Sequence, residues 1–351
     1  MRSIALTAAA LAACCVLAFP FTSSRPAFAQ SDTAELQKKV DALSKQLDDQ
    51  RYTFDQILKG IDDVLWFERV GDVAVVDKVY LTGPPNPKEK PTYGIADERS
   101  PVKFWAYTFV PRKLGTKKAP LLILPHGGVH ADFTTYHTHI VRELMELGYV
   151  VVAPEYRGST GYGQGFENAI DYGGLEVDDC IAARDWAVAN IPNVDGARAG
   201  MIGWSHGGLI ALMAVFDHPD KFACCYAGVP VSDLVMRMGY AGPDYQEEFA
   251  KPYHLGQTAN QNVDEYRKRS PAWNASKLRT PLLIHTTTND RDVNSIEVEE
   301  LIAQLHAANK DFQSKVYKDA PGGHSFNRID TEYAHESRKE IYAFLAKYLK
   351  P

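Results

Sequence analysis

Apolar residues spaced three and four positions apart predict a long amphipathic helix near the start of the chain. Asp32 and Glu35 have the spacing of a capping pair that opens a helix. The apolar positions that follow alternate in a four-three pattern that only Gln50 interrupts: Leu36, Val40, Leu43, Leu47, Phe54, Ile57, Ile61 and Val64. This heptad seam predicts a helix over residues 30–68 that buries the seam against a second copy of the chain or against its own domain.

Two runs with the alternating pattern of β-strands follow this helix. They occupy residues 73–81 and 102–110, and a proline-rich loop from Gly83 to Pro91 separates them. We therefore expect residues 69–118 to form two strands and their connection, ahead of the main domain.

Residues 119–351 alternate short apolar runs with longer helical patterns. The predicted strands are 121–124, 149–153, 200–203, 222–227, 281–285 and 313–317, and the predicted helices lie near 134–147, 176–190, 206–217, 295–308 and 330–349. Strands and helices that alternate in this way predict an α/β fold, with a mostly parallel central sheet covered by helices. The sequence has no internal repeat that would indicate a propeller.

The composition is that of an ordinary globular protein, with 45% hydrophobic and 23% charged residues among 351. The formal net charge is −6. Nucleic acids and anionic membrane surfaces attract basic patches, so a mildly acidic chain indicates neither of these partners.

Residues 1–29 have the features of a secretory signal peptide. Arg2 precedes an apolar run over residues 4–21, and small residues at 27 and 29 predict cleavage after Ala29. An uncleaved anchor is one alternative, but the run is short for a bilayer-spanning helix of about 20 residues. Lipid attachment at Cys14 is a minor alternative. We expect a periplasmic or secreted protein with no integral membrane span in the mature chain.

Three cysteines remain after this cleavage, namely Cys180, Cys224 and Cys225. Their number is odd, and the two adjacent ones are poorly placed to bridge each other. We interpret them as buried free thiols. The spacing of potential ligands matches no metal site, so the sequence predicts neither a metal nor another cofactor.

Residues 203–207 carry the pattern G-x-S-x-G between a predicted strand and an apolar helix. A serine at such a tight turn takes a strained backbone conformation, and the flanking glycines leave space for it. The turn lifts the oxygen of Ser205 clear of the sheet, which predicts that Ser205 is a catalytic nucleophile. The alternative is a serine that only caps the following helix.

A serine nucleophile needs a base, and the base needs an acid that orients it. In α/β-hydrolases the order along the chain is serine, acid, histidine. His324 lies in a glycine-containing loop after the last predicted strand, whereas His335 falls on the final helix. His324 is therefore the expected base. Asp290 and Asp292 both follow the strand 281–285, and both qualify as the acid by position.

The tetrahedral intermediate also needs donors for its oxyanion. The backbone N–H of His206, directly after the nucleophile, is the first expected donor. The second is expected from the loop after the strand 121–124, where Gly127 and Gly128 allow a close approach of the backbone.

Several motifs together resemble the catalytic domain of the prolyl oligopeptidase family over roughly residues 119–350. They are His126–Gly128, Tyr156–Gly163 with the pattern Y-R-G-S-T-G-Y-G, Asp178–Asp179, Gly203–Gly208, Pro230–Asp233 and Ser270–Pro271. In that family the acid lies in a D-x-x-V motif, which matches residues 290–293 and implies Asp290. The chain departs from the family at Thr286, where a glycine is usual.

The resemblance implies an α/β-hydrolase domain that acts on peptides. Full-length relatives carry an N-terminal β-propeller, and we expect none here because too few residues precede the domain. Within the Y-R-G-S motif, Arg157 and Tyr162 are candidate substrate-binding residues. Arg157 is alternatively the partner of a structural ion pair.

We therefore predict a serine hydrolase of the prolyl oligopeptidase type that cleaves peptide bonds through an acyl-enzyme. A carboxylesterase acting on acylated sugars or other esters is the alternative, because the same triad cleaves esters. A non-catalytic binding protein would not need a complete triad. We expect a homo-oligomer through residues 32–65. The first half of this segment would self-associate, and the second half would pack near the active-site side of the domain.

Overall fold

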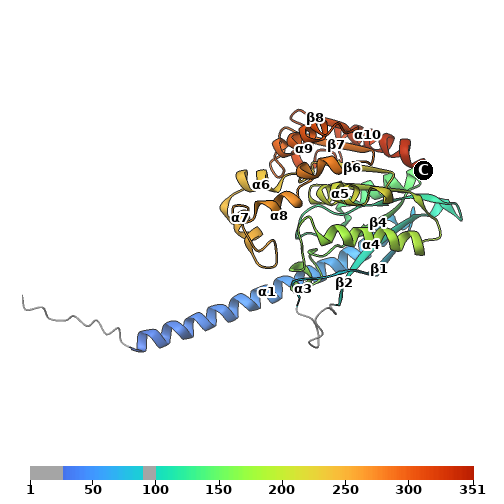
Figure 1. The fold of residues 1–351 in the computed structure, drawn as a ribbon. Helices are drawn as coiled ribbons and strands as arrows, with labels where there is room; N and C mark the ends of the chain where they lie inside the picture. The colour runs from blue at the N-terminus through green and yellow to red at the C-terminus, as the bar shows by residue number, and fades with distance from the viewer. Residues whose placement is uncertain (1–26, 90–99) are drawn as a thin grey trace, which may run out of the picture. The chain divides into compact units, whose positions relative to one another are not determined.

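A computed structural model describes residues 27–89 and 100–351 (Figure 1). The predicted signal peptide lies outside the described residues except for its last three positions, and so does the end of the proline-rich loop. The chain divides into two units, residues 1–50 and residues 51–351. Helix α1, Ala27–Val70, begins in the first unit and ends in the second.

One sheet of eight strands organises the second unit. The strands are β1 (Ala74–Pro85), β2 (Pro101–Pro111), β3 (Ala119–Ile123), β4 (Val150–Pro154), β5 (Val194–Trp204), β6 (Cys224–Gly228), β7 (Leu282–Thr287) and β8 (Gln313–Tyr317). Their order is β1-β2-β4-β3-β5-β6-β7-β8. Strands β1 and β2 pair antiparallel with their neighbours and the rest are parallel, which confirms the α/β prediction. The segment 69–118 therefore extends the main sheet and is not a separate part.

Helices cover both faces of this sheet (Figure 1). They are α2 (Thr138–Leu147), α3 (Gln164–Glu167), α4 (Leu175–Asn190), α5 (His206–Asp217), α6 (Leu234–Tyr240), α7 (Pro243–Ala250), α8 (Val263–Lys268), α9 (Ser295–Ala307) and α10 (Glu332–Leu349). The sequence did not predict α6, α7 and α8, which lie between β6 and β7. Helices of six to eight residues make about two turns, too few to display a helical period.

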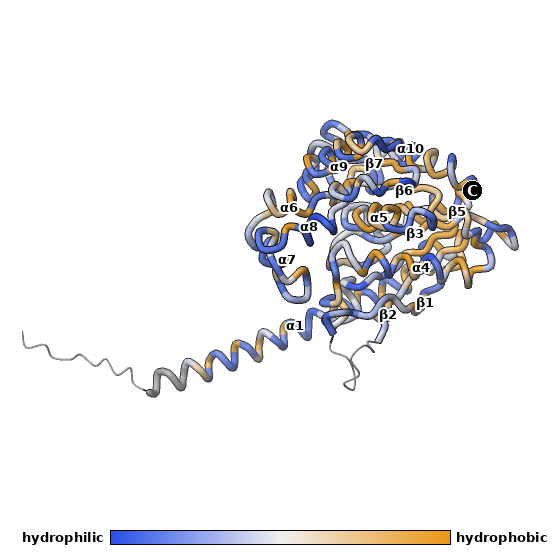
Figure 2. The backbone as a smooth tube through the Cα atoms, in the orientation of Figure 1, coloured by the Kyte–Doolittle hydropathy of each residue, from blue (hydrophilic) through white to orange (hydrophobic). Residues whose placement is uncertain are grey.

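Alternate strand residues feed two apolar clusters, one on each face of the sheet. Leu121 and Ile123 join the cluster that contains α4, α5 and α9. Leu122 joins the opposite cluster, which contains α2, α10 and Trp66 of α1. The apolar character of the central strands and of α5 is visible in Figure 2. Burial on both faces explains why these strands read as continuous apolar runs in the sequence.

Helix α1 packs on the domain with a different face from the one that its heptad seam predicted. Trp66 and Val70 are fully buried, and Trp66 stacks on Phe133 with ring centroids 5.2 Å apart. The seam residues of this part of the helix stay exposed: Phe54 at 64%, Ile57 at 52%, Ile61 at 53% and Val64 at 69%. The second half of the helix therefore packs on the domain near the candidate site, as predicted, but through Lys59, Asp62 and Trp66 and not through its heptad seam.

Among the described residues, no helix combines the length and the apolar character that a membrane crossing requires.

Burial holds several histidines of the domain in their neutral form. It lowers the pKa to about 3 for His126 and His137, and to about 4 for His254 and His285. Unfolding returns each of them to a pKa near 6.5. Their contribution to stability is therefore present above about pH 6.5 and is lost as the pH falls toward the folded values. Glu155 and Glu297 have the opposite effect on stability, because burial raises the pKa of each to about 7. Their contribution is present at low pH and is lost as the pH rises toward 7.

We expect the four histidines to outweigh the two carboxyls, so that the free energy of unfolding falls as the pH drops from 6.5 to 5. His285→Gln removes one titrating group, which should make this loss shallower by up to about 1.4 kcal/mol per pH unit. Urea unfolding at several pH values and constant ionic strength measures both slopes. Equal slopes for the wild type and the variant would contradict the neutral state of His285.

Candidate active site

Ser205 lies at the turn between β5 and α5 with a backbone that serine rarely adopts. Its φ is 58° and its ψ is −124°. A Cβ on Gly203 would lie 2.1 Å from the carbonyl oxygen of Gly207, and a Cβ on Gly207 would lie 2.3 Å from that of Pro125. Only glycine fits these two positions, so the turn is built around the strained serine. The side chain of Ser205 makes no capping hydrogen bond, which argues against a mere helix cap.

His324 and Asp290 come together from the loops that follow β8 and β7. Nδ1 of His324 lies 2.7 Å from Oδ2 of Asp290. The other carboxylate oxygen of Asp290 accepts the backbone N–H groups of Asp292 and Val293, each at 2.9 Å. These bonds fix the buried carboxylate toward the imidazole. The side chain of Asp292 is exposed instead.

Ser205 and His324 line one open cavity of about 430 Å³. Other residues on its wall are Gly127, Gly128, Tyr136, His137, Asp292 and Arg328. No hydrogen bond joins Ser205 to His324 within the part of the chain that the structure describes. Such contacts are often long without substrate and tighten when it binds. His335 lies away from this cavity on α10 and pairs with Asp330 at 2.8 Å.

The expected oxyanion donors lie beside Ser205. His206 is the first residue of α5, where backbone N–H groups are free of helical partners. A Cβ on Gly127 would stand 3.3 Å from Cβ of Ser205 and 3.1 Å from the carbonyl oxygen of Trp204. Gly128 has a φ of 78°, and a Cβ there would stand 2.7 Å from Cβ of Ala131. Glycine therefore brings this loop close enough to offer a backbone donor to a bound carbonyl.

The structure does not place Arg157 or Tyr162 on the wall of this cavity. Arg157 is fully buried and donates to both carboxylate oxygens of Asp179, at 2.7 and 2.8 Å. The structural role is the one that this geometry supports. Tyr162 packs beside Lys78, whose Nζ lies 5.1 Å from the centre of its ring. Assigning these two residues to substrate binding is therefore not supported by their positions.

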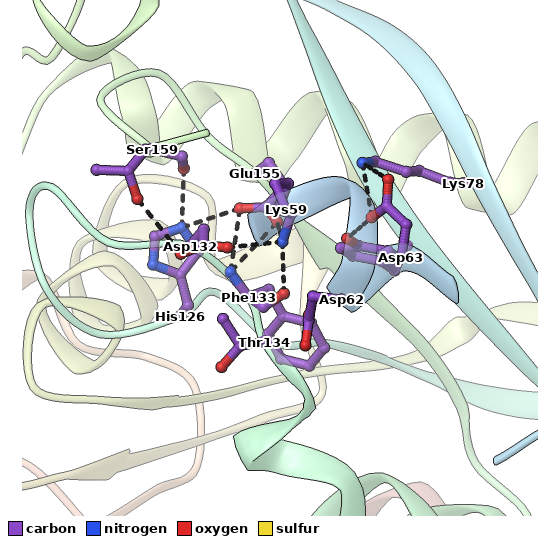
Figure 3. Close-up of polar contacts among 12 residues, drawn as sticks. Lys59, Asp62, Asp63, Lys78, His126, Asp132, Phe133, Thr134, Glu155 and Ser159 are labelled. Carbon is purple, nitrogen blue, oxygen red and sulfur yellow. Dashed lines mark hydrogen bonds and ion pairs between the residues drawn. The ribbon is translucent and has the colours of Figure 1, made fainter. Parts of the chain in front are cut away.

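A buried charge cluster ties α1 to the loop that lines the cavity (Figure 3). Nζ of Lys59 lies 2.5 Å from Glu155 and 3.0 Å from Asp132, and it donates to the carbonyl of Phe133 at 2.7 Å. Glu155 in turn accepts the backbone N–H of Phe133 at 3.1 Å. Lys59 is 3% exposed and Glu155 is fully buried. One lysine of α1 thus holds both the backbone and an acidic side chain of the loop.

Neighbouring acidic residues of α1 extend this attachment. Asp62 accepts the backbone N–H of Thr135 at 3.0 Å and its hydroxyl at 2.7 Å. Asp63 pairs with Lys78 of β1 at 2.6 Å, as Figure 3 shows. Sequence reasoning missed Lys59 and Asp62, because charged residues on the polar face of a predicted helix give no sign that they will be buried.

The structure also groups residues that carry possible metal ligands. His130, Glu248 and His254 form one group and the residues Asp290, Asp292 and His324 form another. The first group combines distant segments, so no spacing in the sequence could have revealed it. Cys180, Cys224 and Cys225 are buried and free, as expected, and burial raises the pKa of each thiol.

Comparison with known proteins places this site in a family context. Residues 135–351 match the model of the prolyl oligopeptidase family. The chain is 27% identical to the mouse acylamino-acid-releasing enzyme over 221 residues, which are 61% of this chain and 30% of that protein. It is 30% identical to dipeptidyl aminopeptidase BIII of Pseudoxanthomonas mexicana over 236 residues, 66% of this chain and 33% of that protein.

The fold has solved counterparts as well. The acylaminoacyl peptidase of Pyrococcus horikoshii superposes with a TM-score of 0.67 at 18% identity, over 79% of this chain and 42% of that one. At 18% identity, this superposition shows that the two chains share a fold. The chain spans about a third of the length of the curated relatives that it matches.

Replacing Lys59 tests its hold on the cavity loop. Lys59→Met leaves Glu155 buried without its counter-ion, which we expect to cost about 3 to 5 kcal/mol of stability. Lys78→Met is the matched control, because it breaks a partly exposed pair with Asp63 and should cost about 1 kcal/mol or less.

Adding Glu155→Gln to Lys59→Met should recover part of the loss, since a neutral amide replaces the buried carboxyl that lost its counter-ion. Chemical unfolding of the wild type, Lys59→Met, Glu155→Gln and the double variant gives a double-mutant cycle, and Lys78→Met is measured beside it. Additive effects of the two substitutions would show that the pair is not coupled.

Proposed function

The chain belongs to the prolyl oligopeptidase family, and from this premise we propose that it is a serine peptidase that cleaves peptide bonds through an acyl-enzyme on Ser205. One observation carries the proposal. A nucleophile on a strained turn shares a cavity with a histidine that a buried aspartate orients at 2.7 Å.

The proposed mechanism assigns a task to each group. His324 removes the proton from the hydroxyl of Ser205 as its oxygen attacks the scissile carbonyl. The negative charge that develops on the carbonyl oxygen is stabilised by the backbone N–H of His206 and by a backbone donor of the loop at Gly127 and Gly128. His324 then passes the proton to the leaving amine. Water next attacks the acyl-enzyme while His324 takes its proton, and His324 gives that proton to the oxygen of Ser205 as the acid product leaves. Asp290 holds the imidazole in the required tautomer and stabilises its charged form.

Two relatives suggest the size of the substrate. Their names describe the release of acylated amino acids and of dipeptides, and we propose short peptides as the substrates of this chain. The alternative carboxylesterase activity would use the same residues. Paired p-nitroanilide and p-nitrophenyl ester substrates with one common acyl group distinguish the two activities.

Substitutions in the proposed triad test the mechanism directly. Ser205→Ala and His324→Ala should each abolish labelling by a fluorophosphonate probe and reduce peptide hydrolysis by several orders of magnitude. Asp290→Asn should lower kcat by about 10⁴, because the orienting charge is lost. Asp292→Asn is the matched control, and we expect it to keep kcat within about tenfold because its carboxylate is exposed. Inactivation by Asp292→Asn but not by Asp290→Asn would overturn the assignment.

We also propose that the exposed seam of α1 pairs with the seam of a second copy of the chain. The first half of the seam is exposed as well, with Leu36 at 63%, Val40 at 51%, Leu43 at 60% and Leu47 at 66%. Flanking charges of both signs, including the pair of Glu35 and Lys39 at 2.9 Å, are typical of a coiled-coil interface.

Light scattering on the chain from residue 30 onward tests this pairing. We expect a dimer or higher oligomer for the wild type, and a monomer for Ile57→Glu/Ile61→Glu, which puts charges into the seam. Gln56→Glu is the control, because it adds a charge on the same helix outside the seam and should leave the mass unchanged. A monomeric wild type at micromolar concentration would contradict the proposal.

A further inference from the structure

Arg328 places a buried cation at the wall of the catalytic cavity. Its side chain comes from the segment after His324 and is 7% exposed. Nη2 donates to the carbonyl of His324 at 2.5 Å. Its Nε is buried without a hydrogen-bond partner among the described residues. Nη1 likewise forms no hydrogen bond within residues 27–89 and 100–351 and, unlike Nε, is not enclosed by protein, so Nη1 is the donor that a ligand in the cavity can reach.

No carboxylate in the described part of the chain forms an ion pair with this guanidinium, although the charges of Asp290 and Asp292 act on it from a distance. Asp290 is bonded to His324 and to two backbone N–H groups. Asp132 on the cavity wall is paired with Lys59 at 3.0 Å. Asp292 is exposed and forms no ion pair with Arg328. Every other arginine that the structure buries as deeply has an acidic partner, namely Arg157 with Asp179 and Arg338 with Glu143.

Arg328 is also close to the reacting atoms. The position that a Cβ would take on Gly127 lies 3.8 Å from Nη1 of Arg328 and 3.3 Å from Cβ of Ser205. The guanidinium and the nucleophile therefore flank the same glycine. Burial disfavours the charged form and lowers the pKa of Arg328, yet arginine stays protonated in proteins. Nearby His137 cannot supply a negative charge, and burial keeps it neutral with a pKa of about 3.

A buried charge without a partner is costly, and buried charges in proteins are normally paired. A charged guanidinium nitrogen is a strong donor to a carboxylate, and Nη1 of Arg328 is free to act as one. We propose that Arg328 binds a carboxylate of the substrate, so that the enzyme prefers substrates with a carboxylate close to the scissile bond. This inference rests on the proposed function and narrows its substrate class.

The carboxylate can come from two parts of a substrate. It is either the free C-terminus of a leaving amino acid or an acidic group on the acyl side. Arg328 is bonded to the backbone carbonyl of His324, and the imidazole of His324 is the group that protonates the leaving amine. The free C-terminus of the leaving amino acid therefore fits the position of Arg328 better than an acidic group on the acyl side. Both sources share one chemistry, and matched substrates distinguish them.

The experiment compares three substrates that share one peptide core. The first ends in a free carboxylate after the scissile bond, the second is its C-terminal carboxamide, and the third is the carboxamide with a glutamate on the acyl side. We expect kcat/KM of the wild type to be about 10- to 100-fold higher for one of the two acids than for the neutral substrate.

Substitution of Arg328 should remove this preference. Arg328→Met should bring the ratio of acid to amide close to one, and Arg328→Lys should retain part of it because the charge remains. Arg291→Met is the matched control, since it removes an exposed arginine beside the same loop and should preserve the ratio. The ratio is the informative quantity, because Arg328 also supports the His324 loop and its loss lowers turnover of every substrate.

A binding measurement separates this inference from the proposed function. Calorimetry with the Ser205→Ala variant should show tighter binding of the preferred acid than of the amide, and Arg328→Met should erase the difference. Wild-type hydrolysis without any preference for either acid would overturn the role of Arg328 and leave the peptidase proposal intact. The same fall in kcat/KM for all three substrates in Arg328→Met would show a purely structural role. Absence of hydrolysis and of fluorophosphonate labelling would instead refute the proposed function.

Discussion

The strained backbone of Ser205 is the constraint on which the rest of the site depends. A residue other than glycine with positive φ costs about 1 to 3 kcal/mol and persists only where its surroundings enforce it. Here β5 ends at Trp204 between two parallel neighbours and α5 begins at His206, so Ser205 alone forms the turn. Gly203 and Gly207 remove the side chains that would push the turn open. The parallel sheet therefore holds Ser205 at the carboxyl ends of its strands, where the loops carrying Asp290 and His324 begin.

Buried charge is the second organising feature of this region. In the cluster of Lys59, Glu155 and Asp132 each charged group has a partner of opposite sign, and the cluster fixes the loop that forms one wall of the cavity. Arg328 on the same cavity has no ion-pair partner among the described residues. The charge of Lys59 thus stabilises the fold, whereas the charge of Arg328 is the one that we propose to bind a ligand. Lys59 precedes the segment 135–351 that matches the family, so α1 contributes to the site from outside it.

Helix α1 has two faces with different partners. The face with Lys59, Asp62 and Trp66 belongs to the domain, where aromatic packing and buried ion pairs hold it. The heptad seam on the other face remains in solvent. The apolar periodicity drew attention to the seam, whereas the residues that attach the helix to the domain are largely charged. Periodicity is a guide to which residues need burial, and it does not reveal which polar residues acquire buried partners.

The sequence by itself determined the α/β class, the strands and longer helices, and the identity of Ser205 and His324 as candidates. These features depend on local patterns, namely buried parallel strands, a glycine-flanked turn and the order of residues along the chain. Only the tertiary structure distinguished Asp290 from Asp292 by geometry, placed Arg157 in an ion pair, and left Arg328 unpaired at the cavity. Those outcomes depend on which groups from distant segments meet, because the energy of a charge is set by its burial and its neighbours.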